Sequence, residues 1–432
     1  MKDKEKAAAP PRDYDDPRRA INRDGFSPDL PRALVSSGDL SGVGWPMRLA
    51  LYMLSGMQKG SLDVFLPNGS VRHFEGSQNG PHGVWRIKNS AGLMRHVLAS
   101  GEVGIGDSYL DDCWDSPDLA RLLEVLYLNE PYYKGPFEKN WLGRLYGYWQ
   151  HRRKSNTKKT ARKNIEHHYD LGNEFYKMWL DETMAYSAGM FIEPTQTLQD
   201  AQINKFKLMF ERLDLRPEHR VLEIGSGWGG FAIYAAAHAG CHVHSITLSQ
   251  EQLVEARARA ARAGVADKVS FELCDYRDVS GQYDRVVSIE MYEAVGEEFW
   301  PTYFEVIAHA LEPGGQAAIQ GITINAAIFE HYRGKRDFIQ KYIFPGGMLC
   351  PPDRFADLSR VAGLLPADAR FYATDYADTL AQWHRNVLSV RDKIVQQFDE
   401  RFLRMWRYYL AYCECGFRTG SIDLMQITLR KP

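Results

Sequence analysis

The segment that most constrains the fold spans residues 220–230 and reads RVLEIGSGWGG. Its first five residues are a short, mostly apolar run typical of a buried strand, and the apolar residues after it begin a helix. Gly225, Gly227 and Gly230 fit the spacing G-x-G-x-x-G, which lets the backbone pass close to a nucleotide-like ligand. The segment therefore predicts a strand, a glycine turn and a helix, the unit on which doubly wound α/β folds are built.

Carboxylates near this turn discriminate between ligands. Glu223 comes two residues before Gly225, where the end of a strand would aim it into the cleft. A dinucleotide enzyme also needs an acid after the next strand to bind the ribose. The next predicted strand, at 241–247, ends in Thr247, Leu248 and Ser249 without one. The pattern favours a cationic, phosphate-free ligand, and S-adenosylmethionine is the predicted cofactor. An NAD-dependent oxidoreductase is the least favoured alternative.

The length and composition of the chain limit the number of domains, the kinds of partner and the location that can be expected. A chain of 432 residues exceeds one ordinary core, so two domains are expected. A net charge of -2 gives no general reason to expect a nucleic-acid partner. The six cysteines lie apart, with no C-x-x-C pair, so we predict reduced thiols and no metal site. No run reaches the roughly 18 apolar residues of a membrane span. We therefore expect a soluble, cytoplasmic protein that at most lies on a membrane surface.

We predict four regions along the chain: a disordered tail at 1–30, an α+β domain at 31–135, a basic linker at 136–164 and a larger domain at 165–432. In the first domain, residues 44–57 and 119–127 have helical spacing, and two alternating runs around Asn68 and Gly69 predict a hairpin. Nothing there indicates catalysis. Residues 150–163 carry seven Lys or Arg and no acid, which is typical of a solvated linker or of a patch that docks on anionic lipid headgroups.

The larger domain alternates predicted strands and helices. The helix at 252–263 is the clearest. Such alternation implies a mostly parallel sheet covered on both faces, with a ligand at the carboxyl ends of the strands. The predicted strands lie at 221–224, 241–247, 269–274, 283–290, 315–322 and 422–429.

Short motifs follow one another through residues 165–430. They are 168–173, Tyr186-Ser187, 198–202, 222–230, Thr247-Leu248-Ser249 with Gln252, 275–278, Glu293 before Val295-Gly296, 342–347, and Tyr376 before 378–380. In this combination and order the chain resembles the cyclopropane-fatty-acyl-phospholipid synthases and their mycolic acid relatives. The resemblance implies a Rossmann-like class I methyltransferase fold with a mostly parallel seven-stranded sheet. It also implies methyl transfer from S-adenosylmethionine to the cis double bond of an unsaturated acyl chain.

The resemblance also assigns the cofactor site. Without it, several of these residues would be interpreted as core or loop, although an aromatic face such as that of Tyr276 can cover a flat purine. His168 and Tyr169 have an equally simple interpretation as capping residues. The implied cofactor-binding residues are Tyr186, Ser187, Glu223, Gly225, Gly227, Thr247, Leu248, Gln252, Asp275, Tyr276 and Arg277.

Methyl transfer to an alkene leaves a carbocation, and the base that removes a proton from it decides the product. Loss of a proton from the new methyl closes a cyclopropane, whereas loss from a neighbouring carbon gives a methyl-branched or methylene-bearing chain. Aromatic faces can stabilise the cation, and Tyr292, Tyr342 and Phe344 are candidates, although each is as readily explained as core.

In the cyclopropane-forming relatives the base is bicarbonate, and this chain matches its pocket in part. Glu293 and Tyr376 stand where the family has its glutamate and tyrosine, but Ala188 replaces a cysteine and Gln320 a histidine. Glutamine still donates a hydrogen bond but supplies no positive charge, and Ala188 keeps its backbone N–H. We therefore predict a catalytic set of Glu293, Tyr376 and Gln320, with Glu293 holding the base or acting as base, and a methyl-branched or methylene product.

The resemblance favours particular partners. The N-terminal domain resembles the extra domain of bacterial members that act on phospholipids, so we expect an unsaturated membrane phospholipid as substrate at the inner face of the cell membrane. Members of the family are often dimeric, which makes a homodimer an expectation. Two other functions stay open, a small-molecule N- or O-methyltransferase and a non-catalytic lipid-binding homologue. A nucleic-acid methyltransferase would need more basic surface.

Overall fold

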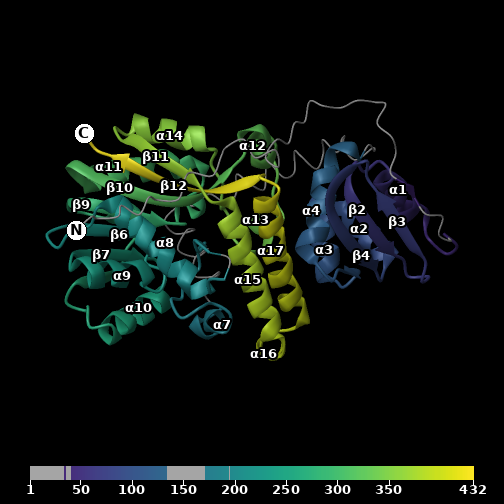
Figure 1. Cartoon of the computed structure of the whole chain (residues 1–432), viewed down its shortest axis with the longest axis horizontal. Coiled ribbons are helices and arrows are strands. Elements are labelled where there is room, and N and C mark those ends of the chain that lie inside the picture. The colour runs from purple at the N-terminus through teal and green to yellow at the C-terminus, as the bar shows by residue number, and fades with distance from the viewer. Residues whose placement is uncertain (1–33, 36–39, 134–170, 194) are drawn as a thin grey trace, which may run out of the picture.

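The computed structural model describes residues 34–35, 40–133, 171–193 and 195–432. The predicted tail, most of the basic linker, and His168 and Tyr169 lie outside these residues. The described chain forms an N-terminal α+β part and a larger α/β part, and helices α15 (Ala373–Ser389) and α17 (Glu400–Arg418) lie between them (Figure 1). Within the described residues, no helix is both long enough and apolar enough to cross a membrane.

The N-terminal part is built on a five-stranded sheet in the order β1-β3-β2-β4-β5. Strands β2 and β3 pair antiparallel around Asn68 and Gly69, which confirms the predicted hairpin. Helices α1 and α4 confirm the helical spacing noted at 44–57 and 119–127. The elements are β1 (Leu34–Val35), α1 (Trp45–Leu54), β2 (Lys59–Phe65), β3 (Val71–Glu75), β4 (Gln78–Ile87), α2 (Ser90–Ser100), α3 (Glu102–Leu110), β5 (Trp114–Asp115), α4 (Leu119–Asn129) and the 3-10 helix η2 (Glu130–Tyr132).

The larger part contains a seven-stranded sheet in the order β11-β12-β10-β9-β6-β7-β8. The five strands from β10 to β8 are parallel, and β12 is antiparallel to both β10 and β11, so the predicted sheet is confirmed. The strands are β6 (Arg220–Ile224), β7 (His242–Thr247), β8 (Val269–Leu273), β9 (Tyr283–Ile289), β10 (Leu311–Ile324), β11 (Leu365–Phe371) and β12 (Ile422–Arg430). Strand β11 was not predicted, because this edge strand contains Pro366 and has no alternating apolar pattern.

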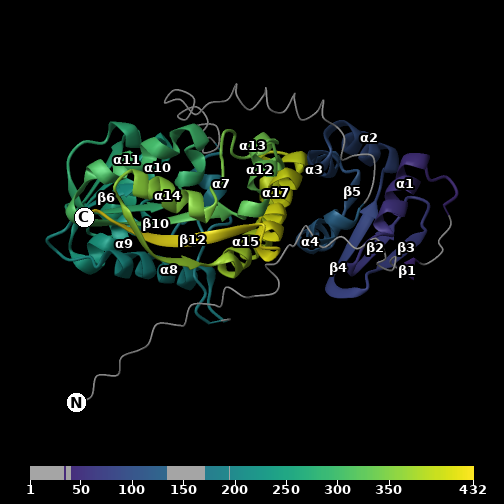
Figure 2. The same cartoon turned by 90° about the horizontal axis from the view of Figure 1, so that it is seen from above.

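Helices cover both faces of this sheet. Successive residues of β6 show the arrangement, since Val221 packs with α8, α9 and α10, whereas Leu222 packs with α11 and α14. Seen from above, α8 and α9 lie on one side of the sheet and α11 and α14 on the other (Figure 2). The remaining helices are α7 (Asn173–Lys177), α8 (Leu198–Leu213), α9 (Gly230–Ala239), α10 (Gln250–Arg262), α11 (Trp300–Ala310), α12 (Ala326–Arg333), α13 (Phe338–Tyr342), α14 (Pro352–Val361) and α16 (Arg391–Gln397), with 3-10 helices η4 (Tyr276–Asp278), η5 (Tyr292–Ala294) and η6 (Glu297–Phe299).

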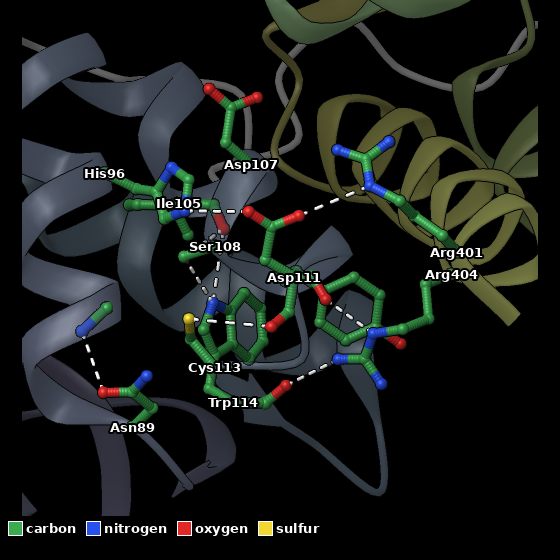
Figure 3. A network of polar contacts seen from close by, with 12 residues as sticks. Asn89, His96, Ile105, Asp107, Ser108, Asp111, Cys113, Trp114, Arg401 and Arg404 are labelled. Carbon is green, nitrogen blue, oxygen red and sulfur yellow. Dashed lines mark hydrogen bonds and ion pairs between the residues drawn. The ribbon is translucent and has the colours of Figure 1, made fainter.

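Helix α17 joins the two parts by packing on α3 and α4. The side chain of Arg404 is buried, and its Nε and Nη2 donate to the carbonyls of Tyr109 and Trp114 at 2.5 and 2.7 Å. Its guanidinium also lies 3.9 Å from the centre of the Tyr109 ring. Nearby, Arg401 pairs with Asp111 (Figure 3). These contacts attach the N-terminal part to the helical insertion of the larger part, which consists of α15, α16 and α17 between strands β11 and β12.

Candidate active site

The glycine turn has the geometry expected from its sequence. Strand β6 ends at Ile224, and α9 begins at Gly230. Gly225 and Gly227 have φ of +99° and +50°, which favour glycine. A Cβ on Gly230 would lie 2.7 Å from the ring of Phe206, so a side chain there would displace its neighbour. The turn therefore needs glycine for its left-handed backbone, and the start of α9 needs glycine for its close contact with Phe206.

Glu223 lies behind this turn rather than open to solvent. Its side chain is only 2% exposed and accepts a hydrogen bond from Ser245 of β7. Burial raises the pKa of Glu223 to about 8, against an opposing effect of Lys205. Lys205 of α8 is fully buried, its Nζ donates to Ser187 Oγ at 2.6 Å, and burial lowers its pKa to about 8. No sequence pattern indicated a role for Lys205, because one lysine in an amphipathic helix normally faces solvent.

Two further groups of predicted cofactor residues follow the carboxyl ends of β7 and β8. Thr247 Oγ1 donates to Gln252 Oε1 at 2.8 Å, and both side chains are buried. Leu248 is half-buried. Arg277 donates hydrogen bonds to the carboxylate of Asp275 from Nε and Nη2, at 2.8 and 2.7 Å. Because β6, β7 and β8 are adjacent and parallel, these residues gather at the same sheet edge as the glycine turn.

Tyr276 lies at this same edge of the sheet and differs from its neighbours in its hydrogen bonding. Its hydroxyl is buried and has no hydrogen-bond partner in the described part of the chain. Burial raises its pKa to about 12, so the hydroxyl stays protonated and available as a donor. An orphaned buried hydroxyl is costly unless a ligand satisfies it.

Tyr186 forms part of an aromatic wall. Its ring packs against those of Tyr176, Trp179 and Trp383, with centroids 5.3–5.6 Å apart. Its hydroxyl shares a 2.6 Å hydrogen bond with that of Tyr409 on α17. The wall thus connects the segment before α8 to the helical insertion.

The centre of the predicted catalytic set is a residue that the sequence did not single out, Glu290. Its Oε1 accepts hydrogen bonds from Ala188 N at 2.9 Å and Gln320 Nε2 at 2.7 Å, and its Oε2 accepts one from Tyr376 Oη at 2.5 Å. Burial raises the pKa of Glu290, and these three donors and Lys205 counteract the effect. The structure therefore brings Gln320 and Tyr376 together, at a carboxylate directly after β9. Its place at the carboxyl end of a predicted strand was the available signal.

Glu293 lies one turn further on and is bonded differently. Its Oε1 accepts from the backbone N–H of Ile322, while Oε2 is buried without a partner among the described residues. Burial, and secondly the charge of Glu290, raises the pKa of Glu293 to about 8. Two neighbouring carboxylates with unequal hydrogen bonding separate in pKa. Glu293 therefore holds its proton more tightly than an ordinary carboxyl group, whereas the donors around Glu290 favour the charged form of that carboxylate.

A chain of hydrogen bonds orients Gln320. Arg212 Nε donates to Gln426 Oε1 at 3.1 Å, and Gln426 Nε2 donates to Gln320 Oε1 at 2.8 Å. Arginine is only a donor, so it fixes the direction of the Gln426 amide, which in turn fixes that of Gln320. The amide nitrogen of Gln320 must therefore face Glu290.

The three aromatic candidates for cation stabilisation lie in three different environments. Tyr292 is 1% exposed and packs among Trp300, Tyr303 and Phe355, which is a core position. Tyr342 donates to Asp107 of the N-terminal part at 2.7 Å and is an interface residue. Phe344 is half-buried, with its ring 6.4 Å from that of Tyr409, and is the candidate that neither a core position nor the interface explains.

Comparison with known proteins agrees with this geometry. Residues 156–427 match the family model described as mycolic acid cyclopropane synthetase. The chain is 41% identical over 346 residues to tuberculostearic acid methyltransferase of Mycobacterium tuberculosis, covering 78% of this chain and 81% of that protein. It is 33% identical over 351 residues to cyclopropane-fatty-acyl-phospholipid synthase of Escherichia coli, covering 80% and 87%.

Comparison with solved structures indicates the same family. A mycolic acid cyclopropane synthase in complex with SAH and CTAB aligns with a TM-score of 0.60 and 28% identity, covering 62% of this chain and 98% of that one. The family model covers well over half of the sequence, so the resemblance inferred from the motifs is confirmed. The chain belongs to the mycolic acid cyclopropane synthetase family and is an S-adenosylmethionine-dependent methyltransferase.

Proposed function

We propose that this enzyme methylates the cis double bond of an unsaturated acyl chain in a membrane phospholipid and releases a methyl-branched or methylene-bearing chain rather than a cyclopropane. The E. coli relative, whose name specifies fatty-acyl phospholipid, aligns with 80% of this chain and so extends into the N-terminal part. The relative with the higher identity is named as a methyltransferase, which supports a product without a ring. Ala188 and Gln320 at the base pocket support the same product.

The residues at the sheet edge fit S-adenosylmethionine. Glu223 places a buried carboxylate beside the glycine turn, and the orphaned hydroxyl of Tyr276 offers a donor. Asp275, Thr247 and Gln252 would complete the binding edge. When bound, the cofactor supplies an electrophilic methyl group on a cationic sulfur. No acid at the tip of β7 and no phosphate-binding side chain is needed for such a ligand.

One observation carries the proposal: the glycine turn and the carboxylate segment share a wall. A Cβ on Gly225 would lie 3.3 Å from the side chain of Met291, which stands between Glu290 and Glu293. The charge of Lys205 acts on both Glu223 and Glu290. A reaction that adds a methyl and then removes a proton needs its donor site and its base at one place.

The chain's own residues would do three things. Because an alkene is a poor nucleophile, they must align it and exclude water. The aromatic wall around Tyr186 can stabilise a carbocation by cation–π attraction. Glu293, Tyr376 and Gln320 would define where the proton leaves the acyl chain.

The substrate proposal also predicts membrane association. The basic run at 150–163 lies outside the described residues, and we propose that it docks on anionic headgroups at the inner face of the membrane. Co-sedimentation with vesicles that contain phosphatidylglycerol, but not with neutral vesicles, is the expected result. Equal binding to both would remove the basic run from the proposal.

The decisive test is the product. Purified protein is incubated with S-adenosylmethionine that carries a trideuterated methyl group and with vesicles of a cis-unsaturated phospholipid, and the acyl methyl esters are analysed by mass spectrometry. Loss of a chain proton beside the cation leaves all three deuterium atoms. Ring closure loses one, and so does a methylene, which forms when a hydride shift moves the cation to the methyl-bearing carbon before the methyl group loses a deuteron. Catalytic hydrogenation then separates a methylene from a ring. A cyclopropane would refute the branched product, and methylation confined to small amines or hydroxyls would refute the lipid substrate.

Glu293→Gln tests the catalytic set. We expect turnover to fall at least about 100-fold, the usual effect of losing an acid–base group, with little change in cofactor affinity by calorimetry. Glu298→Gln is the matched control, because Glu298 lies in the same segment and is exposed. Unchanged turnover in Glu293→Gln would remove Glu293 from the mechanism.

A further inference from the structure

Glu290 is held in a way that folding alone does not explain. Its backbone has φ of +51°, which is uncommon for a residue other than glycine, and its N–H donates to Gln320 O at 2.8 Å. Its side chain is half-buried, so the carboxylate is partly removed from water. A position with backbone strain and a partly desolvated charge points to function.

The groups around the carboxylate can only donate. The N–H of Ala188 belongs to the backbone, and the chain from Arg212 through Gln426 fixes the amide of Gln320. Tyr376 stays protonated, because burial and the charge of Glu290 raise its pKa well above the usual value. Lys205 adds a buried cation nearby. These groups form a pocket built for an anion.

This pocket does not fit bicarbonate. Ala188, Gln320 and Tyr376 are the positions at which cyclopropane-forming relatives are expected to hold that ion, and here all three donate to Glu290. A second anion would find these donors occupied and a like charge beside it. The carboxylate of Glu290 thus stands where the diffusible base would bind.

We propose that Glu290 is the catalytic base of this enzyme and that it replaces bicarbonate. The proposal rests on the proposed function, methyl transfer to an alkene. When the methyl–sulfur bond breaks, its electron pair stays on sulfur, and the π pair of the alkene bonds the methyl carbon. Oε2 of Glu290 then takes a proton from a carbon next to the resulting cation, and the electrons of that C–H bond form a new C=C bond. The carboxyl group passes its proton to water when the product leaves.

The geometry selects Glu290 over Glu293. Oε2 of Glu290 accepts only the Tyr376 hydrogen bond within the described part of the chain, so a lone pair is left for the incoming proton. Glu293 receives one backbone donor, and its pKa is raised to about 8 by burial and by Glu290. A carboxyl group with its pKa raised in this way holds a proton near neutral pH, so it is the poorer first acceptor, and its role is to exchange a proton within the pocket, which Gln at this position could not do.

The first experiment needs no variant. Product formation by the wild-type enzyme is measured in buffer purged of CO₂ and again with bicarbonate added at millimolar concentration. We expect the two rates to agree within twofold. A wild-type rate that falls severalfold without bicarbonate would overturn the proposal, while the appearance of methylated lipid would still support the proposed function.

Variants then probe the carboxylate directly. Glu290→Gln keeps the size and removes the charge, and we expect at least a 100-fold loss of turnover with unchanged cofactor affinity. Glu290→Gly suits the positive φ and frees the three donors, so bicarbonate or formate should restore part of its activity. Retention of activity in Glu290→Gln would refute the assignment.

A binding measurement separates the two proposals. Line broadening of ¹³C-labelled bicarbonate in the NMR spectrum should show binding to Glu290→Gly and none to the wild-type protein, whatever the lipid substrate. Binding of bicarbonate to the wild-type protein, in competition with formate, would refute the proposal that Glu290 replaces bicarbonate. It would do so even if the enzyme methylates phospholipid. The exposed variant Glu298→Gln is the control and should behave as wild type.

Discussion

The hydrogen bond from Tyr376 to Glu290 can be tested through the pH dependence of turnover. Tyr376→Phe removes one hydroxyl at 2.5 Å from Oε2 and leaves the ring stacked on Phe417, with centroids 4.4 Å apart. The substitution creates no large cavity, so the effect should be electrostatic. A hydrogen bond to a charged group contributes about 1.5–3 kcal/mol.

The direction and size of the change in the pH–rate profile follow from the effect of the hydrogen bond on the pKa of Glu290. The hydroxyl donates to the charged carboxylate and favours that form, so its removal raises the pKa of Glu290. A base is active only when it is deprotonated, and therefore the acid limb of the pH–rate profile moves upward. At roughly 1.4 kcal/mol per pH unit, the shift is about one to two pH units. Above the shifted limb, the rate should return to near the wild-type value.

The assay is the initial rate of lipid methylation between pH 5 and 9 at saturating cofactor. Tyr408→Phe is the control, because Tyr408 is a buried tyrosine of α17 that packs on Tyr109 and Phe338 instead of Glu290. An acid limb that stays in place in Tyr376→Phe would show that the rate does not depend on the charge of Glu290. A loss of rate that is equal at every pH would have the same meaning.

Two further predictions concern the cofactor turn and the contact between the two parts of the chain. Gly225→Ala places a Cβ at φ +99° and 3.3 Å from Met291, so cofactor affinity measured by calorimetry should fall at least tenfold while the fold persists. Arg404→Met leaves two carbonyls without their charged donor, and we expect the free energy of unfolding in urea to fall by about 3–5 kcal/mol. Arg401→Met, which removes a more exposed ion pair, should cost less than about 1 kcal/mol.

The elements that the sequence predicted are those whose signal is local. The turn after β6 needs three glycines within six residues, and the apolar run of β6 is buried from Val221 to Ile224, so periodicity and spacing were enough. Strand β11 was missed because none of its residues is fully buried and it pairs with β12 alone. Its position is set by a partner more than 50 residues away in the chain.

The anion pocket around Glu290 could not be predicted from the sequence, for a different reason. Strand register places Gln320 opposite Ile289 in β9 and opposite Gln426 in β12. Glu290 therefore emerges beside Gln320, and the amide of Gln426 lies behind it. No spacing in the chain encodes these two pairings. Motif comparison found Gln320, Tyr376 and Glu293, but only the assembled sheet shows that the first two bind a carboxylate of the protein itself.

The three donors to Glu290 come from three separate elements, and this links the pocket to the rest of the molecule. Ala188 precedes α8, Gln320 lies in β10, and Tyr376 lies in α15. Helix α15 packs along α17, which carries Arg404 and so holds the N-terminal part. A base carried by the chain needs no binding step, and each of its three donors lowers the pKa of the carboxylate. Docking of the N-terminal part on α17 therefore supports the position of Tyr376, and loosening that contact should raise the pKa of Glu290 as removal of the hydroxyl does.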